Sequence, residues 1–291
     1  MKNETSAARQ RNIKTCPMRD IQSERDDRRI PIQKAGIRDL EYPIVVLDRE
    51  NKEQHTVATL AMYVDLPHHF KGTHMSRFLD ILNQHRGRIS LRHIGGMLQS
   101  MVERFDSTTA HLEIRFPYFM EKTAPVSGAR SLMNYDCAFL ATFDRRRRRH
   151  PLDLMVEVSV PVATLCPCSK AISQNGAHNQ RSRVTLRIRS HTLIWIEELI
   201  EIAEASASSG LYSLLKREDE KWVTEQAYRH PRFAEDVARS AAQQLKRDRR
   251  IHWYQVESEN MESIHNHNAY AMVMGERRAR AKKIAAPAGG V

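Results

Sequence analysis

Two cysteines separated by one proline stand where this chain could hold a metal ion or present a reactive thiol. Residues 164–170, TLCPCSK, follow a run rich in β-branched residues, and Pro167 restricts the backbone between Cys166 and Cys168. Thiolates are good ligands for zinc and related metals, and the nearby Lys170 favours the deprotonated form. Free cysteines also pack as small hydrophobic residues, but this polar setting favours a ligand or catalytic role.

A histidine lies twelve residues after Cys166, in the polar and turn-rich residues 175–181, NGAHNQR. This residue, His178, and the thiolate stand on either side of one loop, so the two could converge on a metal ion. A lone histidine is more often incidental. The spacing alone leaves both interpretations open.

Further acids and an imidazole appear in the second half of the chain. Glu220 lies in REDEK, Glu235 in FAEDV, and Glu262 and His265 in ESIHNH. Taken singly, the first two are typical of solvated helix surfaces, and the last histidines could alternate across the entrance of a strand. Together these residues supply acids, bases and a third metal ligand.

In the first half, residues 71–77, KGTHMSR, lead into a predicted helix. Exposed backbone donors near Thr73 and His74, the helix dipole and the guanidinium of Arg77 could bind phosphate oxygens. Ordinary capping by Thr73 or His74 is the alternative, and the sequence alone favours it.

The composition is that of a globular protein with a substantial core: 291 residues, of which 41% are hydrophobic. Nowhere do about 18 apolar residues follow one another, and the N-terminus is polar where a secretory signal needs an apolar stretch. Four cysteines make a disulfide framework unlikely, so we expect a cytoplasmic protein with no membrane partner. The net charge of +11 suits either nucleic acid or a nucleoside triphosphate, and does not decide between them.

The elements that must position these residues follow from the hydrophobic periodicity. Strands are predicted at residues 44–47, 56–64, 111–119, 134–143, 152–162, 183–188, 252–258 and 268–274, and helices at 75–84, 91–105, 194–207 and 231–246. Hairpin-connected strands kept apart from helices indicate an α+β architecture with antiparallel sheets. We expect a flexible basic arm over 1–35, two modules at 36–165 and 166–275, a solvated turn at 145–149, and a flexible tail over 276–291.

Five motifs in order carry a resemblance to a known family: 71–78 KGTHMSRF, 121–128 EKTAPVSG, 166–170 CPCSK, 176–181 GAHNQR and 262–265 ESIH. Together they closely resemble type IB GTP cyclohydrolase I, from about Asp20 to the region of Met274. An ordered set of this length is far more specific than any one motif.

The resemblance implies a bimodular tunnelling fold, with antiparallel sheets whose helices pack on one face and which close into a barrel across several subunits. It implies a homo-oligomer, a tetramer, with active sites at subunit interfaces and no nucleic-acid partner. The implied reaction converts GTP and water to 7,8-dihydroneopterin triphosphate and formate. This step opens the routes to folate and to 7-deazaguanine bases of tRNA.

By the same resemblance, Cys166 looks like a metal-ligating thiolate that also belongs to the catalytic centre, with His178 and Glu220 as the other ligands. The metal implied is divalent: manganese, zinc or iron.

The remaining roles also come from the matching motifs. Cys168 looks like a catalytic thiol beside the purine, and Glu235 resembles the carboxylate that anchors the guanine edge. Glu262 and His265 resemble the groups that assist proton transfer.

Two other interpretations stay open. Another tunnelling-fold purine or pterin enzyme, such as a nitrile reductase, would use a cysteine as a covalent nucleophile. A basic nucleic-acid-binding module would instead use Cys166, Cys168 and His178 to hold a structural zinc, although it lacks a second closely spaced ligand pair.

Overall fold

A nine-stranded antiparallel sheet forms the body of the molecule, in the order β1-β2-β3-β4-β5-β6-β8-β9, with β7 paired to β5. The structure is a computed structural model that describes residues 20–22, 24–85 and 91–277. The strands are β1 (Ile32–Asp48), β2 (Lys52–Leu66), β3 (Thr109–Thr123), β4 (Arg130–Asp144), β5 (Leu152–Leu165), β6 (Asn179–Ser190), β7 (Ser209–Gly210), β8 (Ile251–Asn260) and β9 (Ala269–Glu276). The helices are α1 (Met75–Gln84), α2 (Ile94–Arg104), α3 (Pro167–Ile172), α4 (Ile196–Ser206), α5 (Arg217–Arg229) and α6 (Ala234–Arg247).

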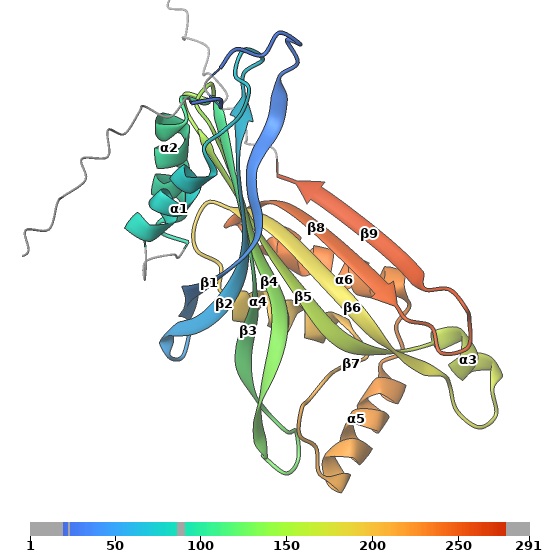
Figure 1. Cartoon of the computed structure of the whole chain (residues 1–291). Helices are drawn as coiled ribbons and strands as arrows, with labels where there is room; N and C mark the ends of the chain where they lie inside the picture. The colour runs from blue at the N-terminus through green and yellow to red at the C-terminus, as the bar shows by residue number, and fades with distance from the viewer. Residues whose placement is uncertain (1–19, 23, 86–90, 278–291) are drawn as a thin grey trace, which may run out of the picture.

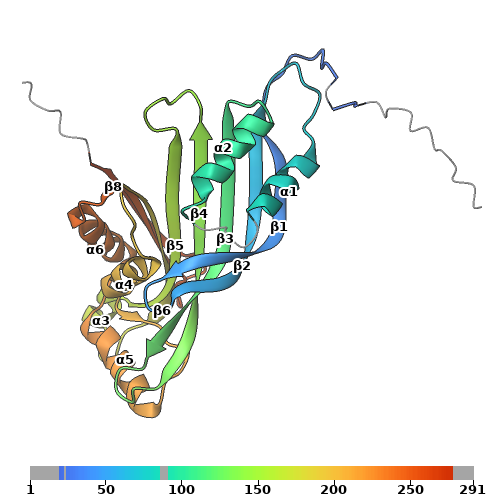
Figure 2. The ribbon, with the colours of Figure 1, turned by 90° about the vertical axis from the view of Figure 1, so that its left-hand side faces the viewer.

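The strands bury one face because their apolar residues recur at every second position. In β2, Ala58, Leu60, Met62 and Val64 are buried, while the residues between them lie on the other face. Helices α1 and α2 cover the first half of the sheet, and α4 and α6 cover the second half (Figures 1 and 2). This arrangement confirms the expected α+β class with helices on one face of an antiparallel sheet.

The chain repeats one pattern twice. Two strands, two helices and two strands run from β1 to β4, and the same pattern runs from β5 to β9 with α3, α5 and the short β7 added. By this repeat, the first unit gives way to the second in the exposed turn at residues 145–149, before the boundary expected between residues 165 and 166. In this turn, Asp144 forms ion pairs with Arg146 and Arg147. The turn expected for this arginine run is therefore present.

The segment before β1 is tied to the loop that follows β2. The amide of Asp26 donates to the carbonyl of His69, that of Lys71 to Glu24, and that of Gly72 to Gln22. Residues 22, 24 and 26 of the expected arm are therefore bonded to this loop, and its residues 32–35 belong to β1. Residues 1–19 and 23, like 278–291 of the expected tail, lie outside the described residues.

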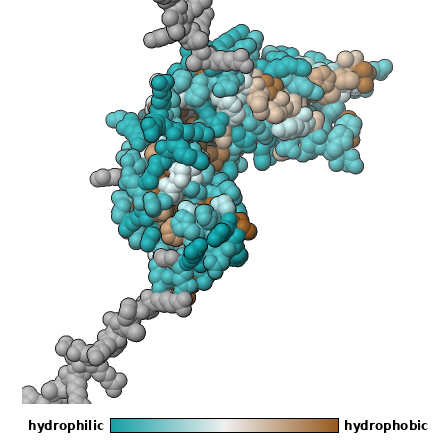
Figure 3. Space-filling view, turned by 90° about the horizontal axis from the view of Figure 1, so that it is seen from above, coloured by the Kyte–Doolittle hydropathy of each residue, from teal (hydrophilic) through white to brown (hydrophobic). Residues whose placement is uncertain are grey.

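The molecular surface seen from above is mainly hydrophilic, with apolar side chains gathered on its right-hand arm (Figure 3). The edge strand β9 exposes Tyr270, Met272 and Met274. None of the helices in the described ranges has the length and apolar character that crossing a bilayer requires.

Candidate active site

Cys166 and His178 lie side by side at the end of β5. Cys166 is the N-cap of α3, where its Sγ accepts the amide of Ser169 at 3.4 Å, and Pro167 starts the helix at a position that needs no N–H donor. The amide of Cys166 donates to the carbonyl of His178 at 3.1 Å. This backbone bond closes the loop between the two residues, as their spacing had allowed.

The imidazole of His178 sits between two side-chain oxygens. Its Nδ1 is 3.1 Å from Oε1 of Gln180 and 4.0 Å from Oε2 of Glu262. Glu262 is held there because the amide of Met261 donates to the carbonyl of Arg181 in β6. The side chains of His178 and Glu262 are only 15% and 10% exposed, so this contact is largely shielded from water.

A chain of hydrogen bonds beneath the site fixes how Gln180 faces His178. The amide nitrogen of Gln180 donates to Oγ1 of Thr164 at 2.9 Å, and that hydroxyl pairs with Oγ of Ser182 at 2.6 Å. Because the amide nitrogen is engaged, the amide oxygen points to His178 and accepts its Nδ1 proton. The other ring nitrogen, Nε2, then carries a lone pair for a metal ion or a proton.

Two further predicted residues lie exposed near this end of the sheet. Cys168 is on the outer side of α3, in contrast to the half-buried Cys166. His265 is in the loop after β8, and its ring stacks on that of His267 with centroids 5.2 Å apart. No hydrogen bond links either side chain to Cys166 or His178 in the described part of the chain.

Glu235 begins α6 beside the cluster. The amide of Arg232 donates to the carbonyl of Leu165, the residue before Cys166, at 3.0 Å. Three residues span at most about 10 Å of chain, so Glu235 is held near this end of β5. Its side chain is exposed and available to a ligand.

Glu220 is further away. It is exposed in the first turn of α5, whereas the end of this helix touches α3 through a hydrogen bond from Lys170 Nζ to the carbonyl of Tyr228. Eight residues at the rise of a helix separate Glu220 from Tyr228 by about 12 Å. Within a single chain in this conformation, Glu220 is therefore not close to Cys166 and His178.

Within the described residues, no three His, Cys, Asp or Glu side chains gather closely enough to hold a metal ion. The donor types of Cys166, His178 and Glu220 suit zinc, and imidazole and carboxylate also suit iron and manganese. Two of these three residues are adjacent, so the third ligand requires a shift of α5 or a contribution from a second copy. The metal site stays a prediction.

The predicted phosphate-binding segment lies at the other end of the sheet. Residues 71–77 follow the end of β2, which lies at the same edge of the sheet as the start of β5. The strand pairs show this: Val64 pairs with Ala110 of β3, Thr109 of β3 with Asp144 of β4, and Phe143 of β4 with Leu152, the first residue of β5. Cys166 follows the opposite end of β5, and thirteen rises of about 3.3 Å make this strand about 40 Å long. One GTP molecule cannot reach both groups within a chain.

His74 occupies the N-cap position of α1, as the sequence favoured, but it makes no side-chain capping bond; its ring instead contacts Asp20 at 3.2 Å. Thr73 is buried with its hydroxyl 3.9 Å from Sδ of Met75. The guanidinium of Arg77 donates to the carbonyl of Arg104 at the end of α2. The position of the cap was therefore predicted, whereas a capping hydrogen bond from the side chain of His74 is absent.

Asp219 is a residue that the sequence did not indicate. Fully buried in the first turn of α5, it accepts the amides of Val126 and Ser127, the hydroxyl of Ser127 and the amide of Lys216. Burial alone would raise the pKa of Asp219, but these hydrogen bonds outweigh it and hold the pKa well below its usual range. Asp219 therefore fixes α5, and with it Glu220, to the β3–β4 hairpin. Its place three residues after the N-cap Lys216 was the available signal.

Comparisons with known proteins identify the family of the chain. A family model described as type I GTP cyclohydrolase folE2 matches residues 18–271. The chain belongs to this family. It is 54% identical to GTP cyclohydrolase FolE2 of Geotalea uraniireducens, over 90% of this chain and 95% of the relative. It is 56% identical to the protein of the same name from Syntrophotalea carbinolica, over 88% and 94%.

Among solved structures, a mutant urate oxidase of Bacillus sp. TB-90 superposes with a TM-score of 0.50 at 9% identity, covering 84% of this chain and all of that one. At this identity the likeness shows the fold alone. It confirms the tunnelling fold expected from the motifs.

Proposed function

We propose that this member of the folE2 family is a GTP cyclohydrolase, which converts GTP and water to 7,8-dihydroneopterin triphosphate and formate. The observation that carries the proposal is the convergence at one end of the sheet of Cys166 and His178, from one loop, with Glu262, from a segment distant in sequence. Relatives more than half identical over most of the chain are named for this activity.

The reaction requires groups of the kinds that meet here. Carbon 8 of guanine is a poor electrophile, so its hydration needs an activated water and a proton for the ring nitrogen, and a second hydrolysis then releases formate. A divalent metal held by Cys166, His178 and Glu220 would lower the pKa of a bound water. Glu262, whose carboxylate lies 4.0 Å from Nδ1 of His178, is placed beside these ligands to accept and return protons directly.

Recognition of the base falls to Glu235. The guanine edge presents the N1 hydrogen and the 2-amino group as paired donors, and one carboxylate accepts both. Glu235 is exposed at the start of α6, next to the carbonyl of Leu165 that accepts the amide of Arg232. The thiol of Cys168 and the ring of His265 are both exposed and therefore open to a ligand.

We propose that the active form is an assembly of several copies, the tetramer that the motifs imply. Residues 71–77 and Cys166 lie about 40 Å apart along the sheet, so a phosphate-binding role for Arg77 needs a second copy. The terminal strands β1 and β9 each leave one edge without a partner strand in the described chain. Pairing between copies would satisfy these edges and would cover the exposed Met272 and Met274 of β9.

Mixing two inactive variants tests this shared site. Arg77→Ala and Cys166→Ala homo-oligomers should each lose GTP turnover, and subunit exchange between them should restore part of it, because some mixed sites receive both native residues. Exchange without any recovery of activity would contradict a site shared between copies.

Metal-free protein supplied with GTP and manganese, zinc or iron in turn tests the activity. We expect a fluorescent pterin after oxidation of the product with at least one of these metals, and none with Cys166→Ala. No pterin with any metal would contradict the proposed function. The cytoplasm remains the location that we propose.

A further inference from the structure

Four arginines share one face of β6, and they fall into two pairs with different surroundings. Arg187 is held by Glu157 and Glu257 on the neighbouring strands, and Arg189 is held by Asp153. Arg181 and Arg183, nearer to His178, make no side-chain hydrogen bond or ion pair within the described residues. Among the described residues, the N–H donors of these two guanidinium groups therefore have no partner.

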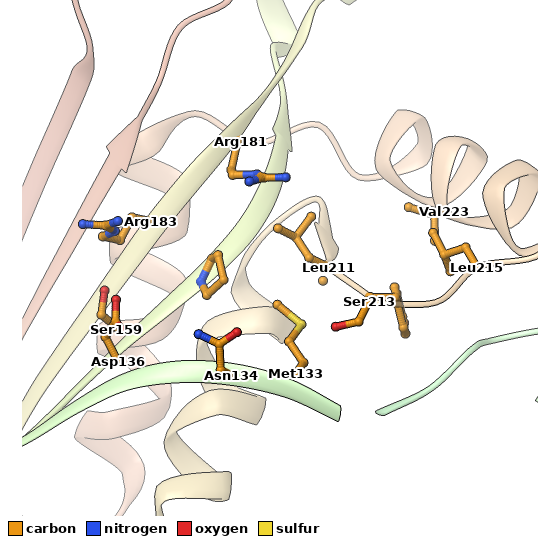
Figure 4. A pocket seen from close by; sticks show the side chains of 13 residues that line it. Met133, Asn134, Asp136, Ser159, Arg181, Arg183, Leu211, Ser213, Leu215 and Val223 are labelled. Atoms are coloured by element: carbon orange, nitrogen blue, oxygen red, sulfur yellow. The ribbon is translucent and has the colours of Figure 1, made fainter. Parts of the chain in front are cut away.

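These two arginines line a cavity of about 370 Å³ between β6, the fork where β4 leaves β5, and the segment from β7 to α5 (Figure 4). The charged residues of its lining are Asp136 and these two arginines, so the net charge of the lining is +1. Asn134, Ser159, Tyr212 and Ser213 add neutral polar groups to the lining.

The cavity lies between the two elements that carry predicted metal ligands. On one side, Arg181 is three residues from His178 along β6. On the other side, Val223 of α5 lines the cavity, and Glu220 lies one turn earlier on the same face of that helix. A molecule bound here would therefore contact the strand that follows His178 and the helix that carries Glu220.

Another cavity of similar size is lined by arginines that are already paired. In the cavity of about 410 Å³ at the β1–β2 turn, Arg49 is paired with Glu201 and Arg130 with Glu121. Acids there neutralise the arginines, and the lining offers no site for an anion.

We propose that Arg181 and Arg183 bind the triphosphate of the nucleotide substrate. The proposal rests on the proposed function for the identity of the nucleotide. Guanidinium groups present paired N–H donors that match phosphate oxygens, and unpaired arginines need not break an existing bond to do so. The triphosphate site is thereby placed on β6, where Arg77 of a second copy would add a further contact, since within its own chain Arg77 lies at the end of α2.

Calorimetric titration of metal-free protein with inorganic tripolyphosphate tests the site without catalysis. Arg181→Ala and Arg183→Ala should each weaken binding about tenfold or more, the usual effect of losing hydrogen bonds between charged groups. Arg189→Ala is the matched control, because it removes the same charge from the same face of the same strand. An affinity that falls equally in all three variants, or in none, would overturn the assignment.

Turnover of GTP and GMP separates this role from a structural one. Wild-type protein should prefer GTP in kcat/KM, and both cavity variants should lose most of that preference through a higher KM for GTP. If the variants lose GTP and GMP turnover in equal proportion, the arginines do not bind the triphosphate. Failure of the wild type to form a pterin would instead refute the proposed function, and the tripolyphosphate titration would still decide the anion site.

Discussion

Replacing Gln180 with leucine should release His178 from the tautomer that its neighbours impose. In the native chain, Oε1 of Gln180 accepts from Nδ1 of His178 at 3.1 Å, while the amide nitrogen donates to Thr164 at 2.9 Å. Leucine removes both bonds, and the carboxylate of Glu262 does not replace them, because at 4.0 Å from Nδ1 it is beyond hydrogen-bond distance. The proton can therefore move to Nε2 and block the nitrogen that would bind a metal.

The size of the effect follows from the two hydrogen bonds that leucine cannot make. Two hydrogen bonds between neutral groups contribute about 1–3 kcal/mol in total, because each is worth about 0.5–1.5 kcal/mol net. For a chain of this size, that corresponds to a Tm lower by about 2–10 °C. Loss of the partner that orients a ligating histidine typically weakens metal binding by about 10–100-fold.

Ser182→Ala is the matched control, since it breaks the bond between Thr164 and Ser182 without touching His178. Two-bond nitrogen–proton spectra of the histidine rings and calorimetric titration with zinc give the two measurements. We expect the Nδ1-protonated pattern of His178 in wild type and Ser182→Ala, and a mixed pattern with weaker zinc binding in Gln180→Leu. An unchanged tautomer, or equal zinc affinity in the two variants, would show that Gln180 does not orient the ring.

Three further variants test neighbouring parts of the molecule. Asp219→Asn should lower the Tm at neutral pH, and the difference from wild type should shrink as the pH falls below about 4. The reason is that a carboxylate with a depressed pKa stabilises the fold only while it is ionised. A Tm difference that does not change with pH in thermal melts would contradict this. Glu235→Gln should weaken an unreactive GTP analogue by tenfold or more in calorimetry, since one matched hydrogen bond becomes a clash of donors; normal affinity would count against the guanine assignment. Cys168→Ala should abolish pterin formation but bind the same analogue, and near-normal turnover would exclude a catalytic thiol.

The sequence predicted best those elements whose apolar residues follow a regular period. Helix α1 runs over Met75–Gln84 as expected, because Phe78, Ile81 and Leu82 form its buried stripe. Helix α5 was missed because only Asp219 and Ala227 are buried in it, so no stripe marks it. Its position depends instead on the hydrogen bonds of Asp219 to the β3–β4 hairpin.

Edge strands were also underestimated. The expectation for β1 covered only residues 44–47, whereas the strand runs from Ile32 to Asp48. No residue of its first half is buried and its register with β2 shifts twice, so the alternation that signals a strand is interrupted.

For the site, the sequence could place Cys166 near His178, because a short loop joins them. It could not reveal the contact of His178 with Glu262, since that contact depends on β8 pairing with β6. The separation of residues 71–77 from Cys166 likewise follows from the strand order, which local patterns do not determine.

The fate of carbon 8 of GTP decides whether this protein opens the purine ring. GTP labelled with ¹³C at position 8 is incubated with the metal-reconstituted protein, and the label is followed by NMR. We expect the ¹³C signal to move from the purine to formate in step with pterin formation, and to stay in GTP when Cys166→Ala replaces the wild type. Turnover of GTP with the label retained in the purine product would contradict a cyclohydrolase.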